Sequence, residues 1–498
     1  MDKKELLELG VVEEGKPKKP TPRLPRREIA CQDPKERIKN FNEVALGYTL
    51  KDAVYEAMRC LECSKPRCVV ACPVHIDIPS FIGLIARGKF EEACEDIRKY
   101  NSLPAVCGRV CPQENLCEAA CIINDTNPKN PIAIGRLERF AADYLLSQEN
   151  GNENKIEIRH KTPFKVAVIG SGPTGLTCAA ELAKMGHTVH LFEALHKPGG
   201  VMMYGIPEFR LPKEIVQKEI NYVRSLGVNI ETNCIIGKTI PVSDIMNEFD
   251  AIYIGTGAGF PNMMHIPGEN FAGIYSANEF LTRVNLMRAY EFPKSSTPIR
   301  KPKKGVVVGA GFTAFDVVRI MLRLGADEAE IVYRRTRKEM PGRGEEIEHS
   351  QEEGAKIREL TNPVRFIGDE NGFVKAVEVQ RMELGEPDSS GRRRPVPVPD
   401  SNYIIDTDLV VIAIGQTPNV LIPSALKNLS TRWGSVINVN RETYMTSVPK
   451  VFAGGDAITG AATVILAIRA AKEASRGIDE FLKDPQKKWY PQAFSEKK

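Results

Sequence analysis

Eight cysteines near the N-terminal end of the chain are the first candidates for chemistry. The run CLECSKPRCVVACP contains Cys60, Cys63, Cys68 and Cys72, and the run CGRVCPQENLCEAAC contains Cys107, Cys111, Cys117 and Cys121. Grouped cysteines form disulfides in secreted proteins, whereas inside cells they bind zinc or iron–sulfur clusters.

Two features favour [4Fe–4S] clusters. The N-terminal residues MDKKELLELGVVEEGKPKK are charged and have no apolar signal core, so we expect a cytoplasmic protein with reduced thiols. Pro73 follows Cys72, and in two-cluster ferredoxins the cysteine before the proline ligates the other cluster. Because the eight cysteines form two groups of four, we expect two clusters. Structural zinc, which a C-x2-C pair can also begin, is the alternative.

A glycine-rich turn follows the apolar run KVAVI and precedes a helical stretch. It has the form G-x-G-x-x-G, which predicts a dinucleotide site because the backbone can approach a pyrophosphate at the helix N-terminus. Glu193 ends the next apolar run, where a carboxylate can bond a ribose 2′-hydroxyl. A plain glycine turn is the alternative. The expected contacts are Gly170, Ser171, Gly172, Pro173, Thr174, Gly175, Gly199, Gly200 and Val201.

A second segment, VPKVFAGGDAITGAATVILAI, is expected to complete the same site. Gly455 and Asp456 follow an apolar run, and Thr463 and Val464 open an apolar helix. Such a turn can hold ribityl and phosphate oxygens at Asp456. The helix N-terminus can face the edge of a flavin on which negative charge builds during reduction.

A second glycine turn, GVVVGAGFTAFD, predicts another dinucleotide site. The apolar run after it is followed by Arg334 and Arg335, where the first site has an acid. Guanidinium groups bind a 2′-phosphate, so we expect NADP(H) here, with Arg343 as a third contact. A solvated basic turn is the alternative. The other expected contacts are Gly309, Ala310, Gly311, Phe312, Thr313, Ala314, Ala413, Ile414 and Gly415.

The C-terminal two thirds of the chain lack the cysteine pair of a dithiol reductase. Such an enzyme needs a C-x-x-C pair beside its flavin, but only Cys178 and Cys234 follow Cys121, and they are far apart. Electrons from a flavin would therefore leave by another route, which points to the N-terminal cysteines.

The elements that must position these residues change character along the chain. The region before the polar linker ENGNENK is mostly helical, as in IPSFIGLIARGKFEEACEDIRKY, whose apolar residues recur every three to four positions. After the linker, short apolar runs alternate with helical stretches, which is typical of parallel sheets with crossover helices. We expect the α/β class: a helical two-cluster domain followed by two Rossmann-like domains.

Length and composition limit the classes of partner. The chain has 498 residues, so we expect more than one domain. Its net charge of +4 is too small to indicate nucleic acid. No apolar stretch reaches the roughly 18 residues of a membrane helix, so we expect no membrane partner.

Six segments carry a resemblance to a known family: VCGRVCPQENLCEAAC, IGRLERFAADY, GGVMMYGIPEFRLPKEI, GAGFTAFD, YRRTRKEMPG and FAGGD. Together they are similar to the glutamate synthase small-subunit family, from about residue 30 to 485. The stretches QDPKERIKNFNEVALGYTLKDAVYEAMRCLEC and CPVHIDIPSFI most resemble the large subunits of NADH-dependent ferredoxin:NADP oxidoreductases, which bifurcate electrons. The N-terminal part of dihydropyrimidine dehydrogenase is a further relative.

The resemblance implies the cofactors and several of their contacts. FAD would occupy the first nucleotide site, with Arg210 and Val110 beside it, and NADP(H) would occupy the second. One [4Fe–4S] cluster would use Cys60, Cys63, Cys68 and Cys121. The other would use Cys72, Cys111, Cys117 and the carboxylate of Glu138, leaving Cys107 as a spare. From the residues alone, Cys107 would be the eighth ligand and Glu138 an ordinary helix-surface acid.

Composition and motif positions set the expected domain bounds, and the proline-bearing segment 291–304 is expected to mark the crossing between the two nucleotide domains. The bounds are 1–30 for an extended basic arm, 31–155 for the iron–sulfur domain, 156–300 and 446–485 for the two parts of the FAD domain, 301–445 for the NADP(H) domain and 486–498 for a C-terminal tail.

The expected function is electron transfer between NADP(H), FAD and two [4Fe–4S] clusters, in the large subunit of a bifurcating complex. Its partners would be ferredoxin and a flavoprotein small subunit that resembles ferredoxin-NADP reductase. The alternatives are a glutamate synthase small subunit with its large subunit, an electron-input subunit of a larger complex such as a hydrogenase, and a scaffold with structural clusters.

Two residues depart from the family pattern. Thr174 replaces the usual alanine after G-x-G-P, which we expect to be tolerated. Phe312 replaces a smaller or polar residue where the backbone meets the pyrophosphate, which puts nucleotide affinity in question.

Overall fold

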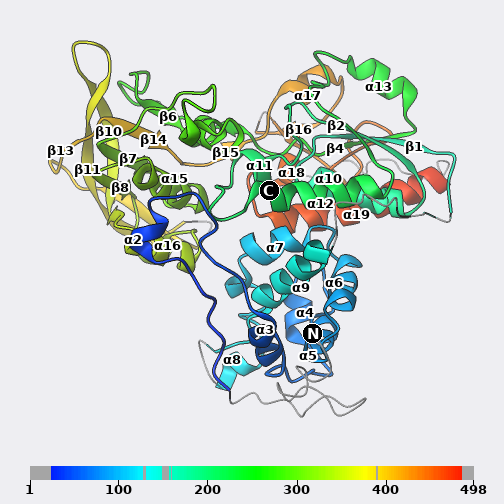
Figure 1. Cartoon of the computed structure of the whole chain (residues 1–498). Coiled ribbons are helices and arrows are strands. Elements are labelled where there is room, and N and C mark those ends of the chain that lie inside the picture. The colour runs from blue at the N-terminus through cyan, green and yellow to red at the C-terminus, as the bar shows by residue number, and fades with distance from the viewer. Residues whose placement is uncertain are drawn as a thin grey trace.

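The computed structural model describes residues 24–126, 130–148, 156, 158, 160–388, 391–433 and 435–484. These residues form three lobes, with a helical domain below two α/β domains in Figure 1. Most of the expected basic arm and the expected C-terminal tail lie outside the described residues.

The helical domain contains the N-terminal cysteines. Its helices begin at ordinary capping residues: Thr49 accepts a hydrogen bond from Asp52 N at 3.2 Å, and Asp77 accepts one from Ser80 N at 3.3 Å. Phe90 packs edge-on against Phe140, with ring centroids 5.2 Å apart. The elements are α3 (Leu50–Ala57), α4 (Arg67–Ala71), α5 (Ile78–Ala86), α6 (Phe90–Arg98), α7 (Pro104–Val110), η1 (Gln113–Asn115), α8 (Ile123–Thr126) and α9 (Ile134–Gln148).

The first α/β domain has a parallel five-stranded sheet in the order β18-β4-β1-β2-β3. Its central strands are almost wholly apolar, as expected for strands covered on both faces. Its elements are β1 (Lys165–Ile169), α10 (Pro173–Lys184), β2 (Thr188–Phe192), α11 (Val201–Tyr204), α12 (Lys213–Ser225), β3 (Asn229–Glu231), α13 (Val242–Glu248), β4 (Ala251–Ile254), α17 (Leu421–Ala425), β16 (Thr431–Arg432), β17 (Val436–Ile437), β18 (Val451–Ala453), α18 (Asp456–Thr459) and α19 (Val464–Lys483).

The second α/β domain repeats the design, with a parallel sheet in the order β6-β14-β7-β8-β9. In chain order, strands β10 to β13 lie between β9 and β14, and they form a separate antiparallel sheet. The elements are β6 (Ile274–Ser276), α14 (Ala277–Leu281), η2 (Thr282–Leu286), η3 (Ala289–Glu291), β7 (Lys304–Val308), α15 (Phe312–Arg323), β8 (Glu328–Val332), η4 (Arg337–Glu339), α16 (Gly344–Glu352), β9 (Lys356–Arg358), β10 (Thr361–Gly368), β11 (Val374–Pro387), β12 (Arg393–Pro397), β13 (Tyr403–Asp406) and β14 (Leu409–Ile412).

The bounds of the two α/β domains differ from the expected ones. The chain crosses between them through the short antiparallel strands β5 (Phe260–Pro261) and β15 (Gln416–Thr417), rather than near residues 300 and 445. β6 lies well before residue 300 and pairs with β14, so it belongs to the second sheet. The proline-bearing segment 291–304 is not the crossing but a loop that leads into β7, because composition alone does not separate a loop within a domain from a link between domains.

A segment expected in the helical domain instead packs against the second α/β domain. It contains α2 (Pro34–Arg37), which lies beside α16 in Figure 1. Phe41 stacks on Tyr290 with ring centroids 4.0 Å apart, and Val44 belongs to the hydrophobic core that contains α15. The N-terminal part of the chain therefore contacts two lobes.

One hydrophobic core runs from the helical domain into the first α/β domain, where it includes buried side chains of α10, α12 and α19. The helical domain is thus packed against that face of the sheet. Within the residues that the structure describes, every helix is too short or too polar to span a lipid bilayer.

Candidate cofactor sites

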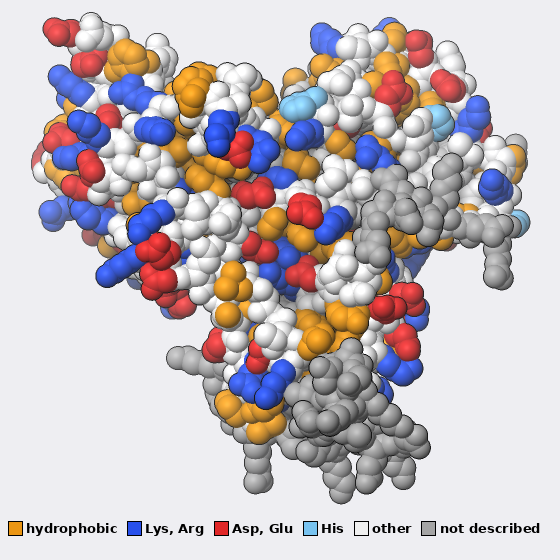
Figure 2. Space-filling model, in the orientation of Figure 1, with side chains coloured by type: hydrophobic (Ala, Val, Ile, Leu, Met, Phe, Trp, Pro, Cys, Tyr) orange, Lys and Arg blue, Asp and Glu red, His pale blue; other side chains and the backbone are white. Residues whose placement is uncertain are grey.

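A cleft of about 1140 Å³ lies between the two α/β domains and is lined by both glycine turns. Figure 2 shows the two upper lobes separated by a notch. Most of the residues predicted to contact nucleotides line this cleft. From the first site these are Val110, Gly170, Ser171, Gly172, Pro173, Thr174, Glu193, Gly200, Val201, Arg210, Asp456, Thr463 and Val464, and from the second Gly309, Ala310, Gly311, Phe312, Thr313, Arg334, Arg335, Ala413, Ile414 and Gly415.

Five predicted residues do not line the cleft: Gly175, Gly199, Gly455, Ala314 and Arg343. The first four belong to the turns but lie on the side away from the cleft. A side chain at Gly175 would meet the carbonyl oxygen of Gly170 at 1.8 Å, so glycine is needed there for close packing of helix and strand. Gly199 N donates a hydrogen bond to the Ser171 hydroxyl at 2.9 Å.

The first turn has the geometry of a phosphate-binding loop. Gly170 has φ of +99°, which permits the sharp turn between β1 and α10. A Cβ built on Gly172 would meet nothing within 4 Å, so the backbone is open to the cleft there. The N-terminus of α10 therefore presents unpaired N–H groups to the space between the lobes.

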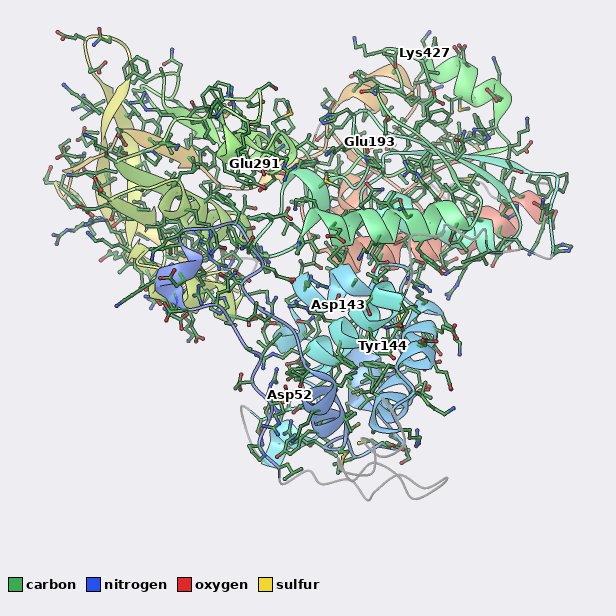
Figure 3. The ribbon with its side chains drawn as sticks, in the orientation of Figure 1. Asp52, Asp143, Tyr144, Glu193, Glu291 and Lys427 are labelled. Atoms are coloured by element: carbon green, nitrogen blue, oxygen red, sulfur yellow. The ribbon has the colours of Figure 1, made fainter. Side chains whose placement is uncertain are left out.

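Glu193 is buried at the end of β2 and is held in one orientation (Figure 3). Ser171 N donates to its carboxylate at 3.0 Å, and Leu195 N donates at 2.8 Å. The Ser171 hydroxyl bonds the same carboxylate. Because a carboxylate has about four acceptor positions, it keeps capacity for the predicted ribose contact.

The C-terminal segment brings a buried hydroxyl without a partner to the same cleft. Thr463 is the N-cap of α19, and its Oγ1 is buried and unbonded among the described residues. A buried hydroxyl in that state needs an acceptor or donor from a ligand or from water. Asp456 accepts a hydrogen bond from Ala462 N at 3.2 Å, and burial raises the pKa of its carboxyl to about 6. These features fit a bound nucleotide.

The segment after β8 places two arginines in the lining of the cleft. Arg334 is exposed, whereas Arg335 is buried and bonds Asp388 at 2.7 Å and the carbonyl of Arg393 at 2.7 Å. Arg392, from the hairpin of β11 and β12, also lines the cleft. Arg392 is not among the contacts predicted from the sequence, because it lies far along the chain from the glycine turn.

Arg343 and Arg210 have partners other than those expected. Arg343 does not reach the nucleotide cleft; it pairs with Glu114 at 3.1 Å and Glu345 at 3.1 Å. It donates to the carbonyl of Arg109, so it joins the second α/β domain to the helical domain. The expected phosphate contact of Arg343 is therefore not supported.

Arg210 lines the cleft, but its guanidinium is bound within the protein. It pairs with Asp316 at 2.8 Å and with Glu346 at 3.1 Å. Burial raises the pKa of Asp316 to about 6, although Arg210 opposes this shift. Arg210 thus joins a loop of the first α/β domain to α15 and α16 of the second.

The first predicted cluster site brings its four cysteines together. Burial, and then the neighbouring Cys68, Cys121 and Cys63, raise the pKa of the Cys60 thiol to about 12. Burial and then Cys121 raise the pKa of Cys68 to about 11. Thiols that disfavour one another's ionisation become thiolates when bound iron compensates their charge. The donor set therefore fits an anionic-ligand metal cluster.

At the second predicted site, five possible ligands lie together, although a [4Fe–4S] cluster needs only four. They are Cys72, Cys107, Cys111, Cys117 and Glu138. Burial raises the pKa of Cys117, and the nearby Cys111, Cys72 and Glu138 raise it further. Burial also raises the pKa of Glu138 to about 8, and its Oε1 accepts a hydrogen bond from Asn101 at 2.9 Å.

The grouping agrees with crosswise use of the two runs, because Cys121 lies with the first set and Cys72 with the second. The choice between Cys107 and Glu138 as the eighth ligand stays a prediction. All twelve cysteines are free of disulfides.

No three of the described His, Cys, Asp and Glu side chains converge closely enough for one metal ion.

The first cysteine set adjoins the second, and the second adjoins the cleft. Cys68 and Cys72 lie one turn apart at α4, with Cys72 N donating to Cys68 O at 3.1 Å, so the two sets adjoin. Cys111 is the C-cap of α7, and the residue before it, Val110, lines the cleft. Figure 3 shows Asp143 of α9 at the same upper end of the helical domain.

Comparison with known proteins agrees with this division. A family model described as dihydropyrimidine dehydrogenase domain II, 4Fe-4S cluster, matches residues 37–150. A model described as pyridine nucleotide-disulphide oxidoreductase matches residues 164–474, more than half of the chain.

The curated relatives include a protein similar over nearly its whole length. The chain is 34% identical over 459 residues to the glutamate synthase (NADPH) small chain of Azospirillum brasilense, covering 90% of this chain and 93% of that one. It is 37% identical over 440 residues to the beta subunit of the NADP(+)-dependent formate dehydrogenase of Moorella thermoacetica, covering 84% of this chain and 60% of that subunit.

Among solved structures, FprA of Mycobacterium tuberculosis in complex with NADPH has the same fold in the α/β domains. It matches with a TM-score of 0.55 at 20% identity, covering 65% of this chain and 85% of FprA.

The cofactors are FAD, NADP(H) and two [4Fe–4S] clusters, as the matched domains and relatives indicate. The chain is an NADP(H)-dependent flavin and iron–sulfur oxidoreductase. It belongs to the glutamate synthase small-subunit family.

Proposed function

We propose that the chain is the large subunit of an electron-bifurcating NADH-dependent ferredoxin:NADP oxidoreductase. A bound FAD would supply two-electron hydride chemistry with NADPH, and bound clusters would supply one-electron transfer. The residues of the chain bind these groups in series: Arg334, Arg335 and Arg392 at the nucleotide end, Val110 at the cleft, and the two cysteine sets beyond it.

The observation that carries the proposal is the direct succession of Val110 and Cys111. One side chain lines the cleft of the nucleotides, and the next residue belongs to the second cysteine set. No dithiol is needed at the flavin, because the cysteines that receive electrons lie on the neighbouring domain.

The first cysteine set lies nearer the surface, which suits electron exit to a carrier protein. Cys60, Cys63 and Cys68 are half-buried, whereas all five donors of the second set are buried. Apolar side chains next to them in sequence or in α4 are exposed, with Leu61 at 38%, Val70 at 77% and Ile122 at 46%. A small apolar surface of this kind suits a weak electron-transfer encounter, and we assign it to ferredoxin.

The balanced reaction needs a second acceptor. Two NADPH release four electrons and two protons. Two electrons reduce two ferredoxins, and two electrons with one proton convert NAD+ to NADH, leaving one proton in solution. We assign the NAD+ branch to a partner flavoprotein that resembles ferredoxin-NADP reductase.

The second candidate is a glutamate synthase small subunit. The similarity to the Azospirillum brasilense small chain over 93% of that chain favours it. In this case the electrons would pass to an amidotransferase large subunit, and neither ferredoxin nor NAD+ would be required.

The native complex, purified without oxygen, tests the proposal. We expect a small flavoprotein to co-purify, and ferredoxin reduction by NADPH to require NAD+. Glutamate formation with a large amidotransferase subunit would replace the proposal with the second candidate. Co-purification with hydrogenase subunits would also overturn the proposal. So would reduction of ferredoxin by NADPH at the same rate with and without NAD+.

A further inference from the structure

At the junction between the helical domain and the first α/β domain, the end of α6 and the start of α7 contact the first α/β domain. α6 ends at Arg98 and α7 begins at Pro104, and the loop between them faces the first α/β domain. Ser102 in this loop donates to Glu181 of α10 at 3.2 Å. The helix ends themselves are capped by charged side chains of the other domain.

Glu219 of α12 caps the N-terminus of α7. Its Oε1 accepts a hydrogen bond from Ala105 N at 2.7 Å, and the residue is only 1% exposed. The first N–H groups of a helix lack partners within the helix and carry partial positive charge. A carboxylate placed there satisfies one donor and complements the helix dipole, although it comes from another domain.

Two lysines of the first α/β domain cap the C-terminal end of α6. Lys184 of α10 donates to the carbonyl of Arg98 at 3.3 Å, and Lys472 of α19 donates to the carbonyl of Lys99 at 3.2 Å. Both lysines pair with Glu181, at 3.2 and 3.5 Å. The first α/β domain thus presents anions to the start of α7 and cations to the end of α6, each matching the sign of the helix end.

The other end of α7 reaches both cofactor sites. Val110 is its last residue and lines the cleft, and Cys111 is its C-cap. The loop before α7 also touches the second cluster site, because Asn101 donates to Glu138 at 2.9 Å and accepts a hydrogen bond from Leu103 N at 3.0 Å. A shift of α7 along its axis would therefore move Val110 and Cys111 relative to the flavin site.

We propose that Glu219 is a positioning residue for electron transfer: by capping α7 from the first α/β domain, it fixes the second cluster site against the flavin site. This inference rests on the proposed direction of electrons from the flavin site to the second cysteine set. It concerns the family reaction in this chain and does not depend on which partner receives the electrons.

Hydrogen exchange of the holoprotein tests the cap without any assay of activity. In Glu219→Ala, the amides at the start of α7 should exchange roughly tenfold faster, because the cap of Ala105 N is lost. Glu219→Gln keeps an acceptor and should restore most of the protection. Glu214→Ala is the matched control, because Glu214 lies on the same helix, is exposed and pairs with Lys218.

Rapid-mixing absorbance with NADPH tests the consequence. In Glu219→Ala, flavin reduction should keep its wild-type rate, whereas cluster reduction should slow roughly tenfold or more, because α7 no longer holds one position. Glu219→Gln should fall near wild type. Flavin and iron content are measured in each variant, so that loss of a cofactor is not mistaken for loss of position.

Three results separate the possible failures. Equal rates of cluster reduction in wild type and Glu219→Ala, with full cofactors, would overturn the inference. Slowing of both steps together would also overturn it, since that indicates general loss of structure. Clusters that NADPH fails to reduce even in the wild type would instead contradict the proposed function.

Discussion

At the scale of single residues, the side chains predicted to hold the clusters are grouped by folding rather than by order in the chain. Cys72 lies in the first run but is placed with Cys111, Cys117 and Glu138, and its pKa is raised by burial and by Glu138. Substitution of single cysteines should therefore empty one site and spare the other.

Cys72→Ser should lower the iron content of the anaerobically purified protein by roughly half, because one of two four-iron clusters loses a thiolate. Cys107→Ala should leave iron content unchanged if Glu138 is the eighth ligand. Iron analysis and the low-temperature electron paramagnetic resonance of each variant check this. Loss of iron in Cys107→Ala together with full iron in Glu138→Gln would reverse the assignment.

Nucleotide choice is also expected to depend on single residues. Arg334→Ala should raise KM for NADPH roughly tenfold and leave KM for NADH unchanged, because an exposed guanidinium that bonds a charged phosphate is removed. Steady-state reduction of a dye acceptor measures both constants. Arg337→Ala is the control, since Arg337 is exposed and bonds Gln351. An equal rise in KM for NADH would show that Arg334 does not bind the 2′-phosphate.

At the scale of elements, α2, α15 and α16 are joined by a buried ion network. Glu353 directly follows α16 and accepts from Arg37 at 2.7 Å, Arg319 at 2.8 Å and Arg323 at 2.6 Å. Burial acts to raise the pKa of Glu353, but hydrogen bonds from Arg323 and Arg319 outweigh it and hold the pKa at about 2. The segment before the helical domain is anchored to the second α/β domain in this way.

Glu353→Gln should destabilise the protein by about 3–5 kcal/mol at pH 7, since three buried arginines lose their shared partner. The folded pKa of about 2 lies below the ordinary value of 4.5, so the carboxylate stabilises the fold fully above about pH 4.5. That contribution falls as pH drops toward 2. Urea unfolding at pH 7 and pH 3 should show a smaller difference between wild type and variant at pH 3.

Glu352→Gln is the matched control for this experiment. Glu352 also pairs with Arg37, but its side chain is 51% exposed, so its loss should cost no more than about 1 kcal/mol. An equal effect of the two substitutions would mean that the buried network is not what anchors α2.

At the scale of the whole molecule, charged side chains meet where the three domains adjoin. Figure 2 shows acidic and basic side chains mixed at the centre of this face, and a cavity of about 430 Å³ is lined there by residues of all three lobes. Arg343 and Arg210 are two of the lining residues that tie the second α/β domain to its neighbours. We therefore expect the angle between the nucleotide domains to depend on these ion pairs.

Arg210→Ala should lower stability by about 3–5 kcal/mol, because Asp316 and Glu346 stay buried with one counter-charge fewer. It should also slow flavin reduction by NADPH, since the domains lose a link across the cleft. Thermal unfolding and rapid-mixing absorbance measure the two effects. Arg288→Ala, at an exposed arginine paired with Glu291, should change neither. Unchanged flavin reduction in Arg210→Ala would show that this link does not set the domain angle.

Local sequence determined much of the architecture. The apolar runs at β1, β2, β7, β8 and β14 and the glycine turns after β1 and β7 were predictable, because strand burial and phosphate loops depend on neighbouring residues. The eight N-terminal cysteines indicated clusters by type and spacing alone. The domain bounds were predicted less well, because β6 is a short strand whose membership depends on its distant partner β14.

Tertiary structure decided which distant groups meet. The sequence by itself determined two nucleotide turns, an arginine pair and two cysteine runs. Only the fold placed Arg343 against Glu114, Arg392 in the same cleft as Arg335, and Glu219 on the N-terminus of α7. These contacts join separate domains, and their electrostatic and hydrogen-bond energies depend on positions in space that no local pattern of residues encodes.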